Sequence, residues 1–561
     1  MAEPGKASKA EAVKENSRQL RGTIADELTT DEAKFSGDNA SLLKFHGSYQ
    51  QDDRDRRGKG GKEYMFMLRT KVPGGKLTAE QVLAELDLCE RYGNGTLRIT
   101  DRQGFQIHGI LKGDLQETIR GVHETKLTTL GACGDVNRNV MCCPAPYVDS
   151  PVRAEMQAMA AALSDHFAPS TTAYYEIWLR NGEDREKVHE QQPAEDPIYG
   201  KAYLPRKFKM AITLPEDNCV DVYANDFGLI AVVEAGSIAG YNVLVGGGMG
   251  MTPAKKQTFP AIGRRMAYVP AEDVIAVAEA VVKVQRDFGR RDDRSQARLK
   301  YLIADWGLER FKAKVEEYLG RSLAEPRPVD VTGVDDHLGW HEQGDGKLFL
   351  GLNVDNGRIK DEGDFRLKSA LRAILGKYGM DCRNTALQGL ILCDIEPGER
   401  GAIEQTLREH GVALAEEISL TRRYAMACPA FPTCGLAITE SERVMPDVLA
   451  GIEAELARHG LGGERFCIHM TGCPNGCARP YTPDIGLVGK SRGKYTIYLG
   501  GNAEGTRLAF VYADQVPQEE IVPRLAPVFA GFKSERTDGE SFGDFCHRRG
   551  EGGLAEFSVE E

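Results

Sequence analysis

Two widely separated parts of the chain repeat one pattern of hydrophobic and polar positions. Residues 66–77 (FMLRTKVPGGKL) and 348–359 (LFLGLNVDNGRI) are apolar, strand-like runs that lead into a turn containing glycine. A helical pattern follows in each copy, and a second strand pattern comes at 98–110 (RITDRQGFQIHGI) and 383–395 (RNTALQGLILCDI). This repeated order of strand, helix and strand predicts a duplicated unit.

The two predicted helices each gather their apolar side chains on one face. In the first copy Val82, Leu86 and Cys89 share that face, and Thr78 with Gln81 is a candidate capping box. In the second copy the apolar face consists of four residues, Leu367, Leu371, Ile374 and Leu375. We interpret the copies as two ferredoxin-like modules related by pseudo-twofold symmetry. Chance similarity between short segments is the alternative.

Larger mixed regions surround the two modules. Their predicted helices lie at 153–167 and 271–288, and their predicted strands at 209–214, 241–245, 494–499 and 508–512. The expected fold class is α+β with a pseudo-twofold duplication. We expect an N-terminal arm (1–60), a first ferredoxin-like module (61–148), a first larger α/β domain (149–335), a second ferredoxin-like module (336–420) and a second larger α/β domain (421–561).

The two copies differ in the charge of equivalent positions. Arg69 aligns with Gly351, Arg102 with Leu387, and His108 with Cys393. The first copy therefore carries cationic or polar groups where the second does not. This asymmetry predicts that only the first copy meets an anionic ligand.

Four cysteines form the strongest candidate for metal chemistry. Cys428 and Cys434 are separated by five residues, and Cys473 and Cys477 by three. Prolines and glycines surround both pairs, which indicates loops whose free N–H groups can stabilise a [4Fe–4S] cluster. A structural zinc ion is the alternative, although zinc sites usually have two to four residues inside each pair.

Cationic residues recur along the N-terminal half. Lys207 and Lys209 alternate at the start of a predicted strand, which places them on one face. With them we group Arg69, Arg98, Arg102 and Arg138. A solvated basic edge would explain any single pair. Taken together, the set predicts a pocket for a small oxyanion or a polycarboxylate.

Composition narrows the class of protein. The net charge of −12 argues against nucleic acid as a partner, and no apolar run approaches the roughly 18 residues that a membrane helix needs. The first residues show no secretory signal and predict a short, polar, mobile arm. Thirteen cysteines in such a chain favour metal binding or simple burial over disulfides, and a cytoplasmic location is expected. We find no fingerprint of a flavin or nicotinamide module.

Several of these motifs resemble one family. The segments CPAFPTC (428–434) and TGCPNGC (471–477) are similar to the cluster motifs of the sirohaem-dependent sulfite and nitrite reductases. The same holds for NRNV (137–140), LPRKFK (204–209) and TDRQ (100–103). The resemblance extends from about Leu20 to Gly550 and implies the family's duplicated fold, in which the two larger α/β domains bind sirohaem and the cluster.

The resemblance also implies roles for the candidate residues. Cys428, Cys434, Cys473 and Cys477 would ligate the [4Fe–4S] cluster, and Cys477 would also bridge to the sirohaem iron. The distal, substrate-binding cations would be Arg69, Arg138, Lys207 and Lys209. Positions near the sirohaem carboxylates would be Arg98, Arg102 and His108.

Substrate and electron donor follow from finer details of the resemblance. Nitrite reductases of the family tend to have Asn where this chain has Lys209, so sulfite is favoured and ferredoxin-dependent nitrite reduction is the alternative. Residues 20–28 and 46–55 resemble the haemoprotein β-subunit of NADPH-dependent sulfite reductase, which takes electrons from a flavoprotein subunit. Residues 61–71 and 129–135 look more like the ferredoxin-dependent enzymes. A non-catalytic iron–sulfur electron carrier is a hypothesis from another class, because it would not need the four distal cations.

Overall fold

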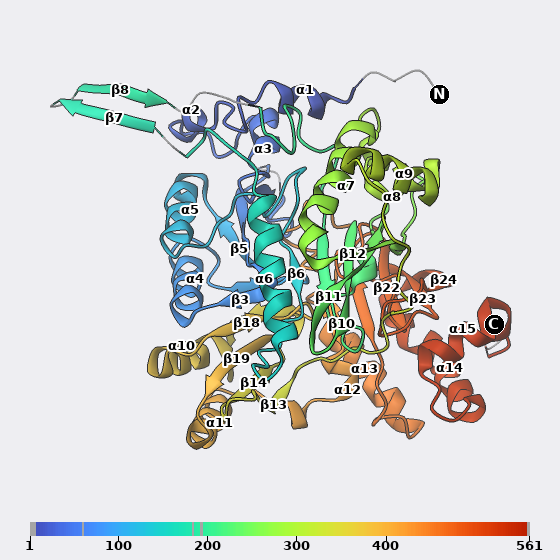
Figure 1. Cartoon of the computed structure of the whole chain (residues 1–561). Coiled ribbons are helices and arrows are strands. Elements are labelled where there is room, and N and C mark those ends of the chain that lie inside the picture. The colour runs from blue at the N-terminus through green and yellow to red at the C-terminus, as the bar shows by residue number, and fades with distance from the viewer. Residues whose placement is uncertain (1–6, 59–60, 175, 182–183, 191–194, 558–561) are drawn as a thin grey trace.

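The computed structural model contains four five-stranded sheets arranged as two pairs (Figure 1). It describes residues 7–58, 61–174, 176–181, 184–190 and 195–557, and the first six residues of the expected arm lie outside this part. One pair of sheets belongs to the ferredoxin-like modules and the other to the larger domains. A separate hairpin, β7 (Glu176–Asn181) with β8 (Asp184–Glu190), extends from the body.

The two modules have matching sheets and helices. The first sheet has the order β1 (Ser48–Asp52), β2 (Tyr64–Thr70), β5 (Phe105–Ile110), β4 (Leu97–Ile99) and β15 (Arg358–Ile359). The second has the order β13 (Gly339–Glu342), β14 (Leu348–Leu352), β19 (Leu390–Ile395), β18 (Cys382–Asn384) and β3 (Lys76–Leu77). Helices cover the outer faces of both, namely α4 (Ala79–Arg91), α5 (Leu115–Glu124), α10 (Leu367–Tyr378) and α11 (Arg400–Glu409).

The strand register confirms the internal repeat. Arg69 pairs with Gln106 in the first module, and Gly351 pairs with Ile391 at the same point of the second. Both second strands also begin after a tight turn of the same form, from Thr100 to Gly104 and from Thr385 to Gly389 (N to O 2.9 Å in each). A Cβ at Gly351 would come within 1.8 Å of the backbone oxygen of His337, so the second copy has no room for an arginine there.

One short strand of each module pairs with the sheet of the other. β15 pairs with β4 through Arg358 and Arg98, and β3 pairs with β18 through Lys76 and Arg383. Apolar side chains from both modules then form one continuous core. The sequence did not predict this exchange, because segments of two residues carry no recognisable strand pattern.

The larger domains repeat one another as well. In the first, β6 (Met141–Cys142), β9 (Met210–Thr213) and β10 (Phe227–Glu234) are parallel, and β11 (Ser237–Val245) and β12 (Arg264–Pro270) continue the sheet antiparallel. In the second, the same arrangement is made by β20 (Ala425–Ala427), β21 (Ile468–Thr471), β22 (Ile485–Ser491), β23 (Lys494–Leu499) and β24 (Phe510–Pro517).

Helices complete the larger domains. The first has α6 (Pro151–His166) between its first two strands, followed later by α7 (Val274–Phe288), α8 (Leu299–Trp306) and α9 (Leu308–Leu319). The second has α12 (Leu420–Arg423), α13 (Met445–Arg458), α14 (Ile521–Glu535) and α15 (Phe542–Ala555). Most of the helices and strands expected in these domains begin and end within three residues of their predicted positions. The exceptions are β11 and β24, which are longer than predicted.

The expectation of a mobile N-terminal arm is wrong for the described residues. From Ser8 on, the segment forms α1 (Lys9–Glu15), α2 (Ile24–Leu28), α3 (Gly37–Leu42) and then β1 of the first sheet. Glu11 and Lys14 are buried and form an ion pair at 2.8 Å, and Lys14 donates to the backbone oxygen of Leu204. A polar sequence is therefore held on the body by buried charge pairs, which hydrophobic patterning does not reveal.

The capping box at α4 is present as expected. The backbone N–H of Gln81 donates to Thr78 Oγ1 at 3.3 Å, and the backbone N–H of Thr78 donates to Gln81 Oε1 at 3.0 Å. Two of the free N–H groups at the start of the helix are thus satisfied.

A buried carboxyl on α4 gives the first testable expectation. Glu85 is buried beside Thr70, and burial raises its pKa from the ordinary 4.5 to about 7. Its ionisation therefore destabilises the folded state as pH rises from 4.5 to 7, by roughly 3 kcal/mol in total. Glu85→Gln should be more stable than the wild type at pH 8, with the gap shrinking towards pH 5. Urea unfolding at several pH values measures this.

Glu80→Gln on the exposed side of the same helix is the matched control and should show no such pH dependence. A Glu85→Gln variant less stable than the wild type at pH 8 would contradict the assignment.

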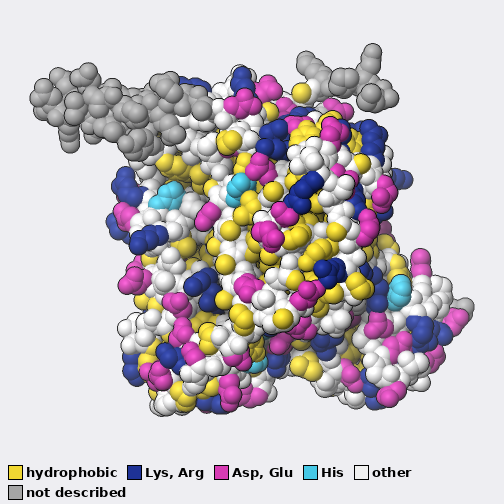
Figure 2. All heavy atoms as spheres, viewed as in Figure 1, with side chains coloured by type: hydrophobic (Ala, Val, Ile, Leu, Met, Phe, Trp, Pro, Cys, Tyr) yellow, Lys and Arg dark blue, Asp and Glu magenta, His cyan; other side chains and the backbone are white. Residues whose placement is uncertain are grey.

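The surface shows no strong charge segregation on the face seen in Figure 2, where basic and acidic side chains are interspersed.

Within the described part of the chain, no helix combines the length and apolarity that a membrane crossing requires. All thirteen cysteines are free thiols, and eleven of them are buried.

Candidate cluster and anion-binding site

The four candidate cysteines lie on loops that leave two neighbouring parallel strands at the same edge. Cys428 follows β20 directly, and Cys473 and Cys477 follow β21. The strands pair in parallel, with Ala427 opposite Met470, so their carboxyl ends bring the loops together. The backbone N–H of Cys428 also donates to the oxygen of Met470 at 3.2 Å.

The loops direct N–H donors at the sulfur atoms. The backbone N–H of Gly472 donates to Cys428 Sγ at 3.3 Å, and Asn475 Nδ2 donates to Cys473 Sγ at 3.4 Å. Backbone N–H groups of Leu436 and Ala437 point at the Cys434 thiol. Such donors stabilise anionic sulfur, as iron–sulfur sites require.

The spacing of the sulfurs bears on the choice between zinc and an iron–sulfur cluster. No three of these four described side chains have their sulfurs within 4.8 Å of one another. Thiolates on one tetrahedral zinc ion would lie about 3.8 Å apart, from Zn–S bonds of about 2.3 Å. The four thiols nevertheless interact electrostatically. Their arrangement fits a core larger than a single ion.

Burial and mutual proximity raise the pKa of three of these thiols, Cys428, Cys434 and Cys473. Burial, with a further contribution from Cys477, raises the pKa of Cys428 well above its ordinary value and that of Cys473 to about 12. A bound metal would therefore have to displace these protons. Cys477 differs from the others because its side chain is exposed.

The candidate cations converge on Cys477 from the first larger domain and the first module. Arg69, Lys207 and Lys209 each lie close enough to Cys477 to interact with it electrostatically. The two lysines flank the buried Phe208, whose backbone is paired with Val136 and Arg138 (N to O 3.0 and 2.9 Å). The structure thus brings together residues from four distant segments.

The lysines are cations without an adequate counter-ion. Burial and the neighbouring Lys209 and Arg206 hold the pKa of Lys207 well below its ordinary value. Burial and the nearby Arg102 lower the pKa of Lys209 to about 7. Proximity to an anion would raise both values. The pocket is therefore built to receive negative charge.

Arg138 and Arg102 are held by backbone oxygens. Arg138 donates to the oxygens of Gly134 (2.9 Å) and Ala132 (3.2 Å). Arg102 donates to Asn225 Oδ1 (2.8 Å) and to the oxygen of Asn139 (2.6 Å). Burial lowers the pKa of Arg102 to about 9, so this guanidinium too lacks sufficient negative charge.

Arg98 and His108 are engaged with other protein groups. Arg98 donates to the oxygen of Ala427, at the end of the cysteine-bearing strand (2.7 Å), and pairs with Glu442 (3.2 Å). Burial and the cations Arg358 and Arg98 hold the pKa of His108 far below its ordinary value, so the imidazole is neutral. Arg98 therefore fixes the module against the cysteine loop, and whether either residue meets a cofactor stays a prediction.

Unsatisfied polar atoms mark where a ligand fits. The Nε atoms of Arg69 and Arg102 and both side-chain polar atoms of Asn137 are buried without a hydrogen-bond partner. Buried polar groups normally find partners. Together with the poorly compensated lysines, this donor set fits a polycarboxylate or oxyanion, and the cysteine loops fit an iron–sulfur core.

Three residues near this site were not predicted. Arg479 donates to the oxygens of Val220 and Ala386 (3.3 and 3.0 Å), and Arg54 Nη1 donates to the oxygen of Ala437 at 2.5 Å. Asp101 interacts electrostatically with Arg69, Arg102 and Lys209. Sequence signals existed for all three, since Arg479 lies two residues after Cys477, Asp101 lies within TDRQ (100–103), and Arg54 lies within the segment 46–55.

Comparison with known families matches nearly all of this architecture. The family described as "Nitrite and sulphite reductase 4Fe-4S domain" matches residues 133–323 and 420–556, and "Nitrite/Sulfite reductase ferredoxin-like half domain" matches 57–125 and 341–410. Each domain type matches twice, as the repeat requires.

Individual relatives match along the whole chain. "Sulfite reductase (ferredoxin)" of Synechococcus elongatus is 46% identical, covering 99% of this chain and 92% of the relative. "Sulfite reductase (NADPH) hemoprotein beta-component" of Staphylococcus saprophyticus is 45% identical, with 97% and 96% covered.

Among solved structures, that of the Mycobacterium tuberculosis NirA protein superposes with a TM-score of 0.79 at 25% identity, with 98% of each chain covered. The family resemblance and the duplicated fold expected from the sequence are both confirmed. The chain belongs to the nitrite and sulfite reductase family and carries its 4Fe–4S domain and both of its ferredoxin-like halves.

Proposed function

We propose that this protein is the haemoprotein of an assimilatory sulfite reductase, which reduces sulfite to sulfide with six electrons. The observation that carries the proposal is the meeting of two sites at one exposed thiol. Cys477 belongs to the four-cysteine set and also lies within electrostatic reach of Arg69, Lys207 and Lys209. An electron carrier without a substrate would not need that half-buried cationic pocket.

The cysteines would hold the metal centre. Cys428, Cys434, Cys473 and Cys477 would ligate a [4Fe–4S] cluster, and Cys477 would also ligate the iron of a sirohaem. When bound, these two groups supply the redox chemistry. The N–H donors on Cys428 and Cys473 would stabilise the negative charge of the reduced cluster.

The four distal cations would bind and orient sulfite. Arg69 and Arg138 would hold the dianion, because guanidinium groups keep their charge and their geometry when buried. Lys209, with its pKa lowered to about 7, can both carry charge and release a proton near neutral pH. Lys207 would do the same once an anion raises its pKa. Arg98, Arg102 and His108 would line the sirohaem side, and the Nε of Arg102, which has no hydrogen-bond partner, would be available to a carboxylate.

An optical spectrum of the purified protein tests the cofactor assignment. A Soret band with a red-region band, typical of sirohaem, is expected together with cluster absorption. A brown iron–sulfur spectrum without those bands would contradict the assignment as a reductase and favour a non-catalytic electron carrier.

The electron donor is proposed to be a separate protein, because the chain has no flavin or nicotinamide motif. Relatives are named both for ferredoxin and for NADPH as the electron donor. From the N-terminal motifs we propose that the donor is the flavoprotein subunit of an NADPH-dependent enzyme, and that the protein works in the cytoplasm. Sulfide production should be faster with NADPH plus the flavoprotein than with reduced ferredoxin. Turnover with ferredoxin alone would reverse the assignment of the donor. Reduction of nitrite but not of sulfite would contradict the assignment of sulfite as the substrate.

A further inference from the structure

A second group of metal-ligand side chains lies where the loops after β6 and β9 of the first larger domain meet the segment before β13. Cys143, Asp217, Cys219 and His337 are all buried, and their ligand atoms lie within 4.8 Å of one another. None of the residues assigned to the cluster or to sulfite belongs to this group. Within the described part of the chain, no other set of three or more His, Cys, Asp or Glu side chains converges in this way.

The group occupies the position that corresponds to the cysteine loops under the internal duplication. Cys143 follows β6 as Cys428 follows β20. Asp217 and Cys219 follow β9 as Cys473 follows β21, and in both domains the two strands are adjacent and parallel. The same edge of both sheets thus presents loops with metal-ligating residues.

The distances fit one tetrahedral ion. His337 Nε2 lies 3.2 Å from Asp217 Oδ2 and 3.5 Å from Cys143 Sγ. Ligands about 2.0 to 2.3 Å from a common zinc ion lie roughly 3.3 to 3.8 Å apart. Cys143 Sγ and Asp217 Oδ2, at 2.8 Å, would separate by less than about 1 Å when a metal replaces the thiol proton.

The surroundings already orient the ligands. Asp217 Oδ1 accepts from the backbone N–H of Cys219 (3.3 Å) and of Asp335 (3.4 Å), which leaves Oδ2 for the ion. His337 Nδ1 lies 3.8 Å from Asp335 Oδ2, beyond hydrogen-bonding distance, so this carboxylate is the nearest acidic group behind the imidazole.

A divalent ion would satisfy the charge balance of the ligated group. With both thiols deprotonated and the imidazole neutral, as metal ligation requires, Cys143, Cys219 and Asp217 would carry three negative charges in a buried site. The guanidinium of Arg153 contacts Cys143 Sγ (2.7 Å) and Asp217 Oδ2 (3.4 Å) and supplies one positive charge. A divalent cation supplies the other two and makes the buried group neutral. Two thiolates with one imidazole and one carboxylate in tetrahedral geometry select zinc.

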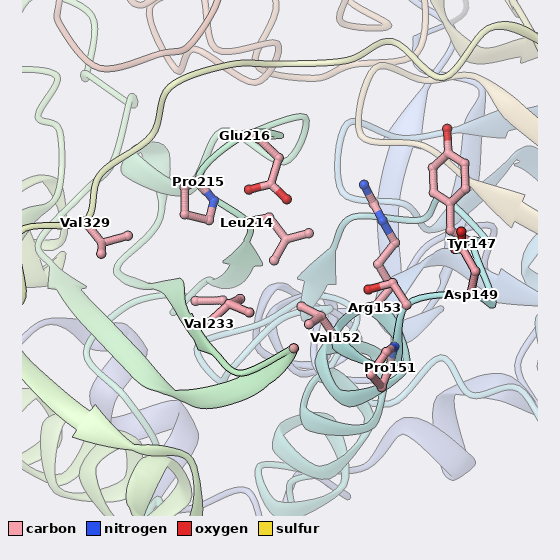
Figure 3. A pocket seen from close by; sticks show the side chains of 13 residues that line it. Tyr147, Asp149, Pro151, Val152, Arg153, Leu214, Pro215, Glu216, Val233 and Val329 are labelled. Atoms are coloured by element: carbon pink, nitrogen blue, oxygen red, sulfur yellow. The ribbon is translucent and has the colours of Figure 1, made fainter. Parts of the chain in front are cut away.

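Arg153 also connects the group to the surface. Its side chain lines a pocket of about 770 Å³, together with Tyr147 and Glu216 (Figure 3). Arg153, which contacts Cys143 Sγ at 2.7 Å, is thus the lining residue that links the pocket to the ligand group.

We propose that Cys143, Asp217, Cys219 and His337 bind a structural zinc ion. The segment between α9 and β13, which we call the linker between the two halves, carries His337. The ion would fasten this linker to the loops that follow β6 and β9. The proposal does not depend on the reductase activity.

Metal analysis of the purified holoprotein tests this directly. Elemental analysis should find about one zinc per chain, and X-ray absorption at the zinc edge should show two sulfur neighbours at about 2.3 Å. Cys219→Ser should lower the bound zinc at least about tenfold while the iron content is unchanged. Cys382→Ser, which changes an equally buried cysteine of the second module, should keep both metals.

Three results would overturn the proposal. The first is a zinc content below about 0.1 per chain, even after incubation with zinc salt and removal of the excess. The second is an unchanged zinc content in Cys219→Ser. The third is a disulfide between Cys143 and Cys219, detected by mass spectrometry. If Cys219→Ser fails to fold, Asp217→Asn, which keeps the shape of the side chain, is measured in its place. The wild-type zinc content remains decisive without either variant.

Discussion

Replacement of Cys473 by alanine is expected to remove the iron–sulfur cluster and to reduce sulfite turnover to less than about one-thousandth of wild type. Cys473 is buried between Gly472 and Pro474 and receives a hydrogen bond from Asn475. No other described cysteine lies on this loop except Cys477, which is itself a proposed ligand. Iron should fall from roughly five atoms per chain to about one or fewer, as measured by elemental analysis, with loss of the cluster signal in electron paramagnetic resonance of the reduced protein.

Cys393→Ala is the matched control for this experiment. Cys393 is as buried as Cys473 and lies at the position of the second module that corresponds to His108. Its removal leaves a small cavity, costs on the order of 1 kcal/mol, and should leave the iron content unchanged. Full iron content in Cys473→Ala, or equal iron loss in both variants, would contradict the ligand assignment.

Replacement of Lys209 by asparagine should lower kcat/KM for sulfite by about a hundredfold or more, and that for nitrite by less than about tenfold. The lysine would face a dianion in one case and a monoanion in the other, so the lost attraction differs. The backbone N–H of Lys209 is held by Asp226 Oδ2 (2.9 Å), and this contact does not involve the side chain. Steady-state assays with both substrates under one donor system measure the ratio.

Two further variants make the result interpretable. Lys490→Asn changes an exposed lysine paired with Asp514 and should affect neither substrate. Lys209→Arg keeps the charge but loses an ionisable group with a pKa of about 7, so sulfite binding should persist at higher pH while the proton supply declines. Equal losses on sulfite and nitrite in Lys209→Asn would remove Lys209 from the account of substrate choice.

Local patterns predicted much of this molecule. The capping box of Thr78 and Gln81 and the strand at 494–499 are predicted from short segments, and each involves residues that are neighbours in the chain. Each copy of the repeat is recognised from short segments too, although the two copies lie far apart. The cysteine loops could be predicted for the same reason, since each pair lies in one loop. The placement of Lys207 and Lys209 followed from simple alternation on an extended segment.

Features made by contacts across the chain escaped prediction. The N-terminal segment is polar, but Glu11 and Lys14 are buried because Arg291 and Asp135 from other segments pair with them. Arg98 is predicted as one of the pocket cations, and its ion pair with Glu442 depends on a contact between distant segments that the sequence does not reveal. Cys143 and Cys219 looked like ordinary buried thiols, because their partner His337 is more than a hundred residues away.

The exchange of β3 and β15 between the modules also bears on the origin of the chain. A first half that ended before the linker would lack the edge strand β15 of its own sheet, and its strand β3 would have no sheet to pair with. Such a half could complete its sheet only by pairing with a second half. Two identical halves would satisfy each other around a twofold axis and present two identical metal-binding edges. Fusion of such a homodimer into one gene would free each edge to diverge, so that one half could keep the redox centre while the other specialised in holding the scaffold.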